Sequence, residues 1–212
     1  MTDNITVFTQ NSIRITDGDR RIYIDPFQMK GEPHDADFIL ITHDHYDHFS
    51  PEDIVKVAGK ETVLVVPEKM ESKVNTVAAY VRKVVTVTPG IHCDIEGLDV
   101  ETVPAYNLMK PFHPKSAEWV GYLLQVEGKR IYIAGDTDAT KEAKAVRCDI
   151  ALVPIGGTFT MDVKNAAELI NTIRPEVAIP THYGSIVGEI TDGEAFARLV
   201  KEPVRVEIKI TK

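Results

Sequence analysis

The sequence predicts an α/β fold built from two similar halves. Short apolar runs of strand length alternate with helix-like segments along the 212 residues. The segment GDRRIYIDP at 18–26 resembles EGKRIYIAGD at 127–136, and ADFILI at 36–41 resembles CDIALV at 148–153. Polar residues follow these runs in both halves. Two related halves that faced each other would therefore bring both sets of strand ends to one edge.

The first half begins with short strands and continues into a helix. Strand-like runs occur in NITVFTQ, NSIRITDG, DRRIYIDP and ADFILITH. A helix should start with Ser50 as its cap and Pro51 in the first helical position, and should end at Gly59. TVLVVPE at 62–68 predicts a buried strand, MESKVNTVAAYV a short helix, and KVVTVTPG and LDVETVPA two further strands.

The second half repeats the alternation of strands and helices. WVGYLLQVEGKRIYIAGDTD predicts two strands joined at 127–129, and CDIALVPIGG predicts the next strand. A helix over roughly 163–173, closed by Arg174-Pro175, precedes a strand in EVAIPTH. A helix near 193–201 and the alternating strand VRVEIKI complete the chain. No shift in composition marks a boundary, so we expect residues 1–212 to form a single domain.

Charge and composition favour a small-molecule substrate. The formal net charge of -8 and the pI near 5.4 argue against a broad surface for nucleic acid or anionic membrane. No run of 18 apolar residues and no leader-like segment is present, so we expect a cytoplasmic protein without a membrane span. Cys93 and Cys148 lack a C-x-x-C spacing and should be buried or spare thiols. A homo-oligomer is compatible with these features.

Histidines are concentrated in the stretch ILITHDHYDHFS at 39–50, which holds three of the seven in the chain. Alternate side chains of an extended chain share a face, so His43 and His45 can reach one metal ion. Asp47 and His48, further along the turn, can then reach a second ion. The sequence therefore predicts a site for two divalent cations. Asp44 and Tyr46 occupy the alternate positions and should line or support the site.

The pattern H-x-H-x-D-H in this stretch resembles the signature of the metallo-β-lactamase superfamily of metal-dependent hydrolases. The resemblance implies a four-layer αβ/βα sandwich and three further landmarks. By this resemblance Asp25 supports the site, Asp136 bridges two metal ions and His182 is the last histidine ligand. From the residues alone, Asp25 and Asp136 fit ordinary turns equally well, and His182 fits a structural histidine.

The third metal-binding motif departs from the simplest pattern of the superfamily. Many members place a histidine where this chain has Asn107, and asparagine is a poor zinc ligand. His113, six residues later, is either a ligand reached through a longer loop or a loop residue that packs or touches substrate. If neither residue binds, the first metal position lacks a ligand.

Six phrases resemble the subgroup related to L-ascorbate-6-phosphate lactonase and N-acylphosphatidylethanolamine phospholipase D: PAYN, FHPK, WVGYLL, IYIAGDTD, PIGGTFTMD and IPTHYG. Gly156 and Gly157 would let a ligand approach a strand end, or would simply form a turn. Thr160, Met161 and Asp162 should cap the following helix. With Asp25 and Asn107, we expect Gly157 and Tyr183 to support the site or contact substrate.

The chemistry implied is hydrolysis by a metal-bridging hydroxide of an ester, lactone, amide or phosphodiester in a small anionic molecule. Asp47 would ligate the second ion and orient the nucleophile, as the catalytic residue. Related iron proteins carry an acid in the slot of His45, so this residue favours zinc, with manganese as an alternative. Two other functions stay open: a nuclease or phosphodiesterase, and a metal-binding regulatory protein without turnover, which Asn107 motivates.

Overall fold

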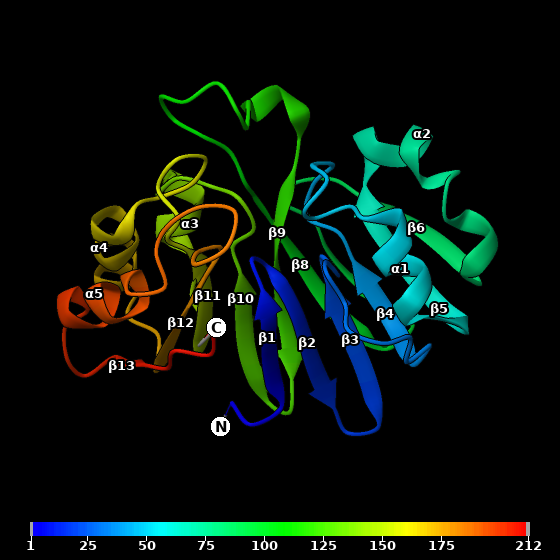
Figure 1. Cartoon of the computed structure of the whole chain (residues 1–212), viewed down its shortest axis with the longest axis horizontal. Helices are drawn as coiled ribbons and strands as arrows, with labels where there is room; N and C mark the ends of the chain where they lie inside the picture. Colours follow the sequence, from blue (N-terminus) through cyan, green and yellow to red (C-terminus); the bar gives the residue numbers. More distant parts are fainter. Residues whose placement is uncertain (1, 211–212) are drawn as a thin grey trace. The chain divides into compact units, whose positions relative to one another are not determined.

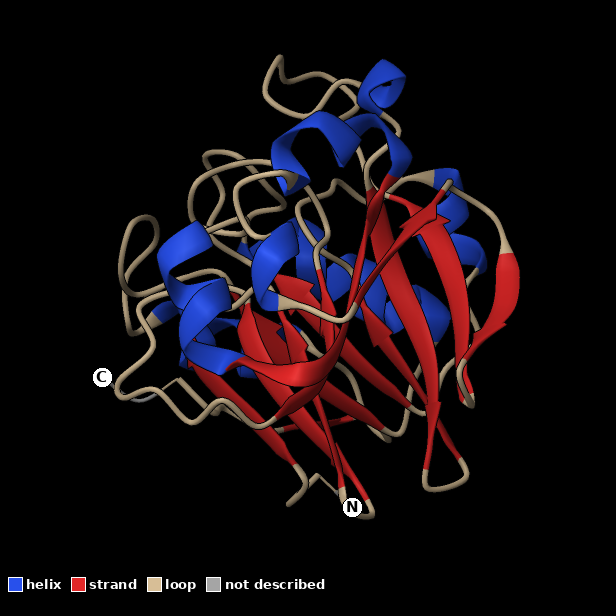
Figure 2. Cartoon of the chain, turned by 90° about the vertical axis from the view of Figure 1, so that its right-hand side faces the viewer, coloured by secondary structure: helices blue, strands red, loops and turns tan. Residues whose placement is uncertain are grey.

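The computed structural model describes residues 2–210, which form two compact units, Met1–Thr88 and Pro89–Lys212 (Figure 1). Each unit contains one β-sheet and a few short helices, and strands make up most of the regular structure (Figure 2). The predicted α/β class is thus confirmed. That residues 1–212 form one domain stays a prediction. None of the helices in the described part of the chain is long and apolar enough to cross a membrane.

The first unit holds a six-stranded sheet in the order β1-β2-β3-β4-β5-β6. Strands β1 to β3 pair antiparallel, and β3 to β6 pair parallel. The strands are β1 (Ile5–Thr9), β2 (Ser12–Asp17), β3 (Arg20–Ile24), β4 (Ala36–Leu40), β5 (Ala58–Pro67) and β6 (Lys83–Val87). The helices are α1 (Pro51–Val57), α2 (Glu71–Val74) and the 3₁₀ turns η1 (Glu68–Met70) and η2 (Ala78–Tyr80).

Helix α1 begins as predicted but ends earlier. The Ser50 hydroxyl accepts the backbone N–H of Asp53 and Pro51 occupies the first turn, where its missing N–H costs nothing. The prediction that Gly59 ends the helix is wrong, because Gly59 already lies in β5. A Cβ atom at this position would lie 2.8 Å from the carbonyl oxygen of His34. The glycine therefore permits a close approach of two chain segments.

The core of the first unit fixes the strand that precedes the histidine-rich turn. Side chains of β3, β4 and β5 pack with α1 and α2 in one cluster, which includes Tyr23, Ile39, Ile41, Ile54, Val57, Leu64, Val66 and Val74. Burying an aliphatic side chain of this kind stabilises the fold by about 1.5–3 kcal/mol. The end of β4 is thus held rigidly.

The second unit holds a seven-stranded sheet in the order β13-β12-β11-β10-β9-β8-β7. Strands β10 to β13 pair parallel and β7 to β10 antiparallel. The strands are β7 (His92–Ile95), β8 (Leu98–Pro104), β9 (Val120–Val126), β10 (Lys129–Ile133), β11 (Ile150–Pro154), β12 (Val177–Thr181) and β13 (Arg205–Val206). The helices are α3 (Lys141–Ala145), α4 (Val163–Ile173), α5 (Asp192–Leu199) and the 3₁₀ turn η3 (Lys115–Ala117).

Two helices of this unit follow the sequence prediction, and the last strand does not. Asp162 caps α4 by accepting the N–H of Asn165, and α5 covers most of the predicted span. The predicted strand VRVEIKI is shorter than expected, because only Arg205 and Val206 pair with β12. β12 continues to Thr181, but Pro180 in this strand has no N–H to donate to a neighbouring strand, so alternation alone does not extend the ladder.

The internal sequence similarity corresponds to a repeated strand register. In the first unit Ile22 pairs with Phe38, and in the second Ile131 pairs with Ile150. Both strand pairs carry the same hydrogen bond from a backbone N–H to a carboxylate. The Arg21 N–H donates to Asp37 and the Arg130 N–H to Asp149, at 2.7 Å each. The two units therefore present matching strand ends.

Candidate metal centre

The first group of metal-binding side chains follows β4, in the turn at 42–49. His43 and His48 are buried, with ring centroids 3.9 Å apart. Nε2 of His43 lies 3.0 Å from Nδ1 of His45, and Oδ2 of Asp47 lies 3.6 Å from Nε2 of His48. The turn is closed by N–H groups of His48 and Phe49, which donate to the His45 carbonyl. Four candidate ligand side chains are thus gathered in one tight turn.

Asp25 is the centre of a buried hydrogen-bond network beneath this turn. Its carboxylate accepts the Thr42 N–H at 2.8 Å, the Thr42 hydroxyl at 2.7 Å and the Asn11 amide at 2.8 Å. It lies 2.7 Å from Nδ1 of His48. Because a carboxylate only accepts, Nδ1 of His48 carries the hydrogen. The bond leaves Nε2 of His48 as the nitrogen available to a metal ion.

Thr42 orients the ring of His43 in a similar way. Its hydroxyl hydrogen goes to Asp25, so its oxygen accepts from Nδ1 of His43, 3.0 Å away. The ring of His43 therefore presents Nε2 on the side of His45. Thr42 was not singled out in the sequence, where its only signal is its place next to His43.

Asp44 and Tyr46 contact residues outside the group of histidines. The Asp44 carboxylate pairs with the Lys73 ammonium at 2.6 Å, and Tyr46 is 66% exposed with its ring edge against Phe27. The contacts given for Asp44 and Tyr46 thus lie outside the group of histidines, whereas the sequence predicted that these two residues line or support the site.

The second group consists of three buried side chains in the second unit: His113, Asp136 and His182. Oδ2 of Asp136 lies 3.3 Å from Nε2 of His113 and 3.3 Å from Nε2 of His182. Asp136 follows β10, and His182 follows β12 in the left-handed conformation, with φ 56°. One carboxylate oxygen between two imidazole nitrogens is a donor set suited to a divalent cation. Each of these three side chains belongs to the candidate ligand set, as do His43, His45, Asp47 and His48.

The two candidates for the third motif take different places. The Asn107 side-chain oxygen accepts from the backbone N–H of His113 at 3.1 Å and lies 3.0 Å from its Nδ1. The Asn107 amide donates to the Phe159 carbonyl at 3.0 Å, which fixes the orientation of the amide group. Nδ1 of His113 therefore donates to Asn107, and Nε2 is left on the side of Asp136.

Gly156 lies closer to a candidate ligand than Gly157 does. A Cβ atom at Gly156 would lie 2.4 Å from the carbonyl oxygen of His182 and 2.5 Å from Cγ2 of Val187. Gly157 has φ +82° and donates its N–H to Met161, in the turn that leads to α4. A glycine at 156 thus allows the chain to pack against the His182 backbone, which the sequence did not distinguish from a simple turn.

Tyr183 does not join this group. The side chain is fully buried, and its hydroxyl donates to the Ile210 carbonyl at 3.3 Å. Burial, with a smaller contribution from Asp192, raises the pKa of Tyr183 to about 12. The geometry gives Tyr183 a packing role instead of the substrate contact expected from its place beside His182.

Comparison with known proteins identifies the family. The profile of the β-lactamase superfamily domain matches residues 4–182. The chain belongs to this superfamily. A UPF0173 metal-dependent hydrolase of Pyrococcus abyssi is 31% identical over 208 residues, which cover 91% of this chain and 90% of that protein. The chain is thus also a member of the UPF0173 metal-dependent hydrolase family.

Two solved structures share the fold of this chain. A protein of Parabacteroides distasonis is 30% identical, with a TM-score of 0.82 and coverage of 98% of this chain and 93% of that one. Igni18, a metallo hydrolase of Ignicoccus hospitalis, superimposes with a TM-score of 0.76 at 24% identity and shares the fold. It covers 97% of this chain and 94% of its own.

Proposed function

We propose that this chain is a hydrolase that binds two divalent cations and cleaves an ester, lactone or phosphodiester bond in a small anionic molecule. The proposed ligands are His43, His45, Asp47, His48, His113, Asp136 and His182. One observation carries the proposal: a single oxygen of Asp136 lies 3.3 Å from the Nε2 atoms of both His113 and His182.

The orientation of the imidazole rings supports metal binding. His43, His48 and His113 each have their Nδ1 atom bonded to an oxygen of Thr42, Asp25 or Asn107. A ring whose Nδ1 is bonded in this way turns Nε2 to the opposite side, as in histidine ligands of zinc. A mixture of nitrogen and carboxylate ligands favours zinc, and manganese is the alternative that metal analysis would reveal.

The two ions would lower the pKa of bound water toward neutrality and stabilise the charge that develops on the attacked group. The protein residues orient and hold these components. Asp47 is the proposed catalytic residue and would orient a nucleophilic water; its side chain is buried, at 7% exposure, and its Oδ2 lies 3.6 Å from Nε2 of His48, which supports this proposal. Asp25 and Asn107 hold the rings of His48 and His113 from behind.

The substrate class rests on charge and on the resemblance of the motifs to lactonases and phospholipases. The net charge of -8 disfavours a nucleic-acid substrate, so a nuclease is the weaker alternative. A regulatory protein without turnover was suggested by Asn107 in the third motif. Because Asn107 orients His113, this residue no longer favours a loss of activity.

Metal analysis and a substrate panel test the proposal. We expect about two ions per purified chain by mass spectrometry of metals, and a loss of metal in Asp136→Ala and His45→Ala. His92→Ala is the matched control, since this exposed histidine pairs with Asp99 in the second unit. The metal-free protein, reloaded with zinc or manganese, should hydrolyse at least one lactone, phosphodiester or thioester. A folded protein that binds no metal would overturn the proposal, and two bound ions without any turnover would favour the regulatory protein.

A further inference from the structure

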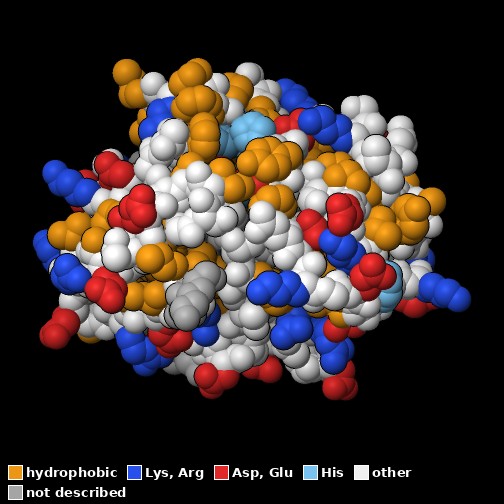
Figure 3. Space-filling view, viewed as in Figure 1, with side chains coloured by type: hydrophobic (Ala, Val, Ile, Leu, Met, Phe, Trp, Pro, Cys, Tyr) orange, Lys and Arg blue, Asp and Glu red, His pale blue; other side chains and the backbone are white. Residues whose placement is uncertain are grey.

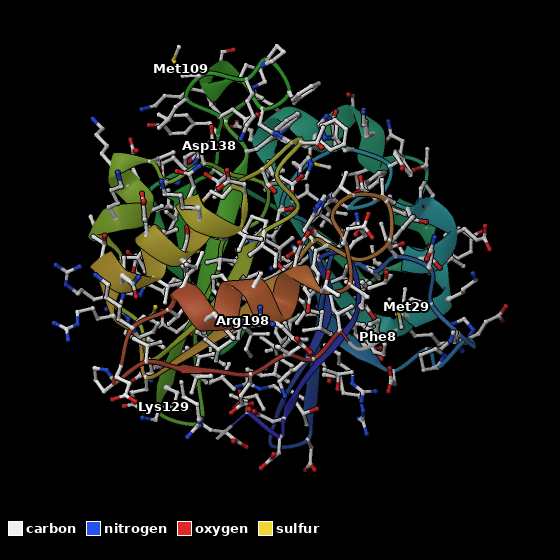
Figure 4. The ribbon with its side chains drawn as sticks, turned by 60° about the vertical axis from the view of Figure 1, so that its left-hand side comes forward. Phe8, Met29, Met109, Lys129, Asp138 and Arg198 are labelled. Carbon is white, nitrogen blue, oxygen red and sulfur yellow. The ribbon has the colours of Figure 1, made fainter. Side chains whose placement is uncertain are left out.

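The loop at 107–113, here called the ligand loop, ends at His113 and exposes most of its apolar side chains. Leu108 is 56% exposed, Met109 94% and Phe112 40%. Figure 4 shows Met109 at the tip of this loop. Hydrophobic side chains also gather at the top of the face in Figure 3, over the green segment of Figure 1 that contains the loop. Apart from the edge-to-face contact of Phe112 with Phe159, whose ring centroids are 4.8 Å apart, apolar burial therefore contributes little to holding the loop in place.

Polar contacts hold the loop instead. Its two ends are joined by the bond from the Asn107 N–H to the His113 carbonyl, at 2.8 Å. In its middle, Asp138 accepts the N–H of Leu108 at 2.9 Å and the ammonium of Lys110 at 2.7 Å. The Lys110 ammonium also donates to the Thr160 carbonyl. The side chains of Lys110 and Asp138 are only 30% and 14% exposed, so the pair is partly shielded from water.

The same turn carries both Asp138 and the proposed ligand Asp136. The N–H of Asp138 donates to the Tyr106 carbonyl at 3.0 Å, and the Thr137 hydroxyl accepts the Tyr106 N–H at 3.2 Å. A change that loosens the contact between Asp138 and the loop would therefore let His113 move relative to Asp136. A shift of a ligand by about 1 Å is enough to weaken a metal site.

We propose that Lys110 and Asp138 are positioning residues, which clasp the ligand loop so that Nε2 of His113 stays beside Asp136. The inference rests on the proposed function, because it assigns these two residues a role toward the metal ions. It predicts that the affinity for metal depends on an ion pair that touches no ligand directly.

Four variants separate the contributions to the clasp. Lys110→Met removes the charge and keeps the length of the side chain, and Lys110→Arg restores the charge. Asp138→Asn keeps an acceptor for the Leu108 N–H, and Asp138→Ala removes both contacts. We expect Lys110→Met and Asp138→Asn to weaken binding of one of the two zinc ions about 10-fold to 100-fold, with kcat lowered and KM nearly unchanged. Lys110→Arg should recover most of this affinity, and Asp138→Ala should lose more.

Lys129→Met is the matched control. The Lys129 ammonium lies 3.0 Å from both carboxylate oxygens of Glu176, and Figure 4 shows Lys129 far from Asp138 within the same unit. The zinc affinity of Lys129→Met should equal that of the wild type. Hydrogen exchange at the Leu108 amide, measured in the metal-free proteins, gives a second readout. We expect it to accelerate in Asp138→Ala and in Lys110→Met but not in Lys129→Met.

The two proposals fail in different ways. Absence of metal from the wild type would overturn the proposed function, while exchange at Leu108 would still report on the clasp. Wild-type zinc affinity together with unchanged exchange in Lys110→Met and Asp138→Ala would overturn the clasp and leave the proposed function intact.

Discussion

The side-chain oxygen of Asn107 lies 3.0 Å from Nδ1 of His113 and also accepts the backbone N–H of this histidine. Replacing Asn107 by alanine removes both bonds and frees the ring. We expect Asn107→Ala to bind zinc about 10-fold to 100-fold more weakly, as measured by competition with a chelator.

Asn171→Ala is the control for this variant. The Asn171 amide donates to the Leu199 carbonyl at 3.0 Å, and its oxygen accepts the Lys201 N–H at 2.7 Å, so it makes two bonds of the same kind. We expect it to lower the free energy of unfolding by about 1 kcal/mol and to leave zinc affinity unchanged. Equal zinc affinity in both variants would contradict the role given to Asn107.

Asp25→Asn should disturb the first ligand group without straining the backbone. Asp25 has φ 45°, and asparagine tolerates this left-handed conformation well. The amide cannot accept all the hydrogen bonds that Thr42, Asn11 and His48 now donate. We expect the metal-free protein to lose about 1–3 kcal/mol of unfolding free energy in urea and zinc affinity to fall. A variant with normal stability and affinity would show that Asp25 does not control His48.

Gly156→Ala should move His182, whereas Gly157→Ala should not. The new Cβ atom at 156 would meet the His182 carbonyl oxygen at 2.4 Å, and backbone must shift to relieve this contact. At 157 the nearest atom is the Asp162 Cβ at 3.6 Å, and the positive φ alone costs about 1 kcal/mol. We expect weaker zinc binding only in Gly156→Ala, measured beside thermal stability. Equal zinc affinity in the two variants would refute the close-packing argument.

Glu142 makes stability depend on pH below the physiological range. Burial alone would raise the pKa of Glu142, but the Tyr106 hydroxyl at 2.8 Å and the Lys115 ammonium at 3.0 Å hold it at about 2. Because this pKa is lowered on folding, the stabilisation is complete above about pH 4.5 and is lost as the pH falls toward 2.

Glu142→Gln tests this pH dependence. We expect the variant to be about 1 kcal/mol less stable than the wild type at pH 6, on the scale of a partly exposed ion pair. The difference should shrink steadily toward pH 2 in urea unfolding curves. A difference that stays constant between pH 6 and pH 3 would show that Glu142 keeps its ordinary pKa.

Local patterns sufficed where the determining contacts are local. The helix at 163–173 was predicted correctly, because the residues that determine its start and its end, Asp162 and Arg174-Pro175, lie next to it in the sequence. Gly59 was misread as a helix end because its constraint comes from the distant carbonyl of His34. The short β13 was overestimated for a similar reason, since strand length depends on the partner strand.

The candidate site divides in the same way. The cluster from His43 to His48 is visible in the sequence, because its members follow one another within one short turn after β4. The relation of Asn107 to His113 depends on a loop that contacts Asp138 and Phe159, in hydrogen bonds that span 30 and 52 residues of the chain. No local pattern encodes such a contact. The metal-binding role of these residues stays a prediction until metal is measured.

The register repeated in β3-β4 and β10-β11 supports different side chains at equivalent positions. The two units offer equivalent strand ends, yet Asp25 follows β3 as an orienting residue and Asp136 follows β10 as a proposed ligand. After β4 the chain places histidines, and after β11 it places Gly156. Equivalent positions in two sheets can thus serve different tasks, because the segments that follow the strands carry different residues while the register of the strands stays the same.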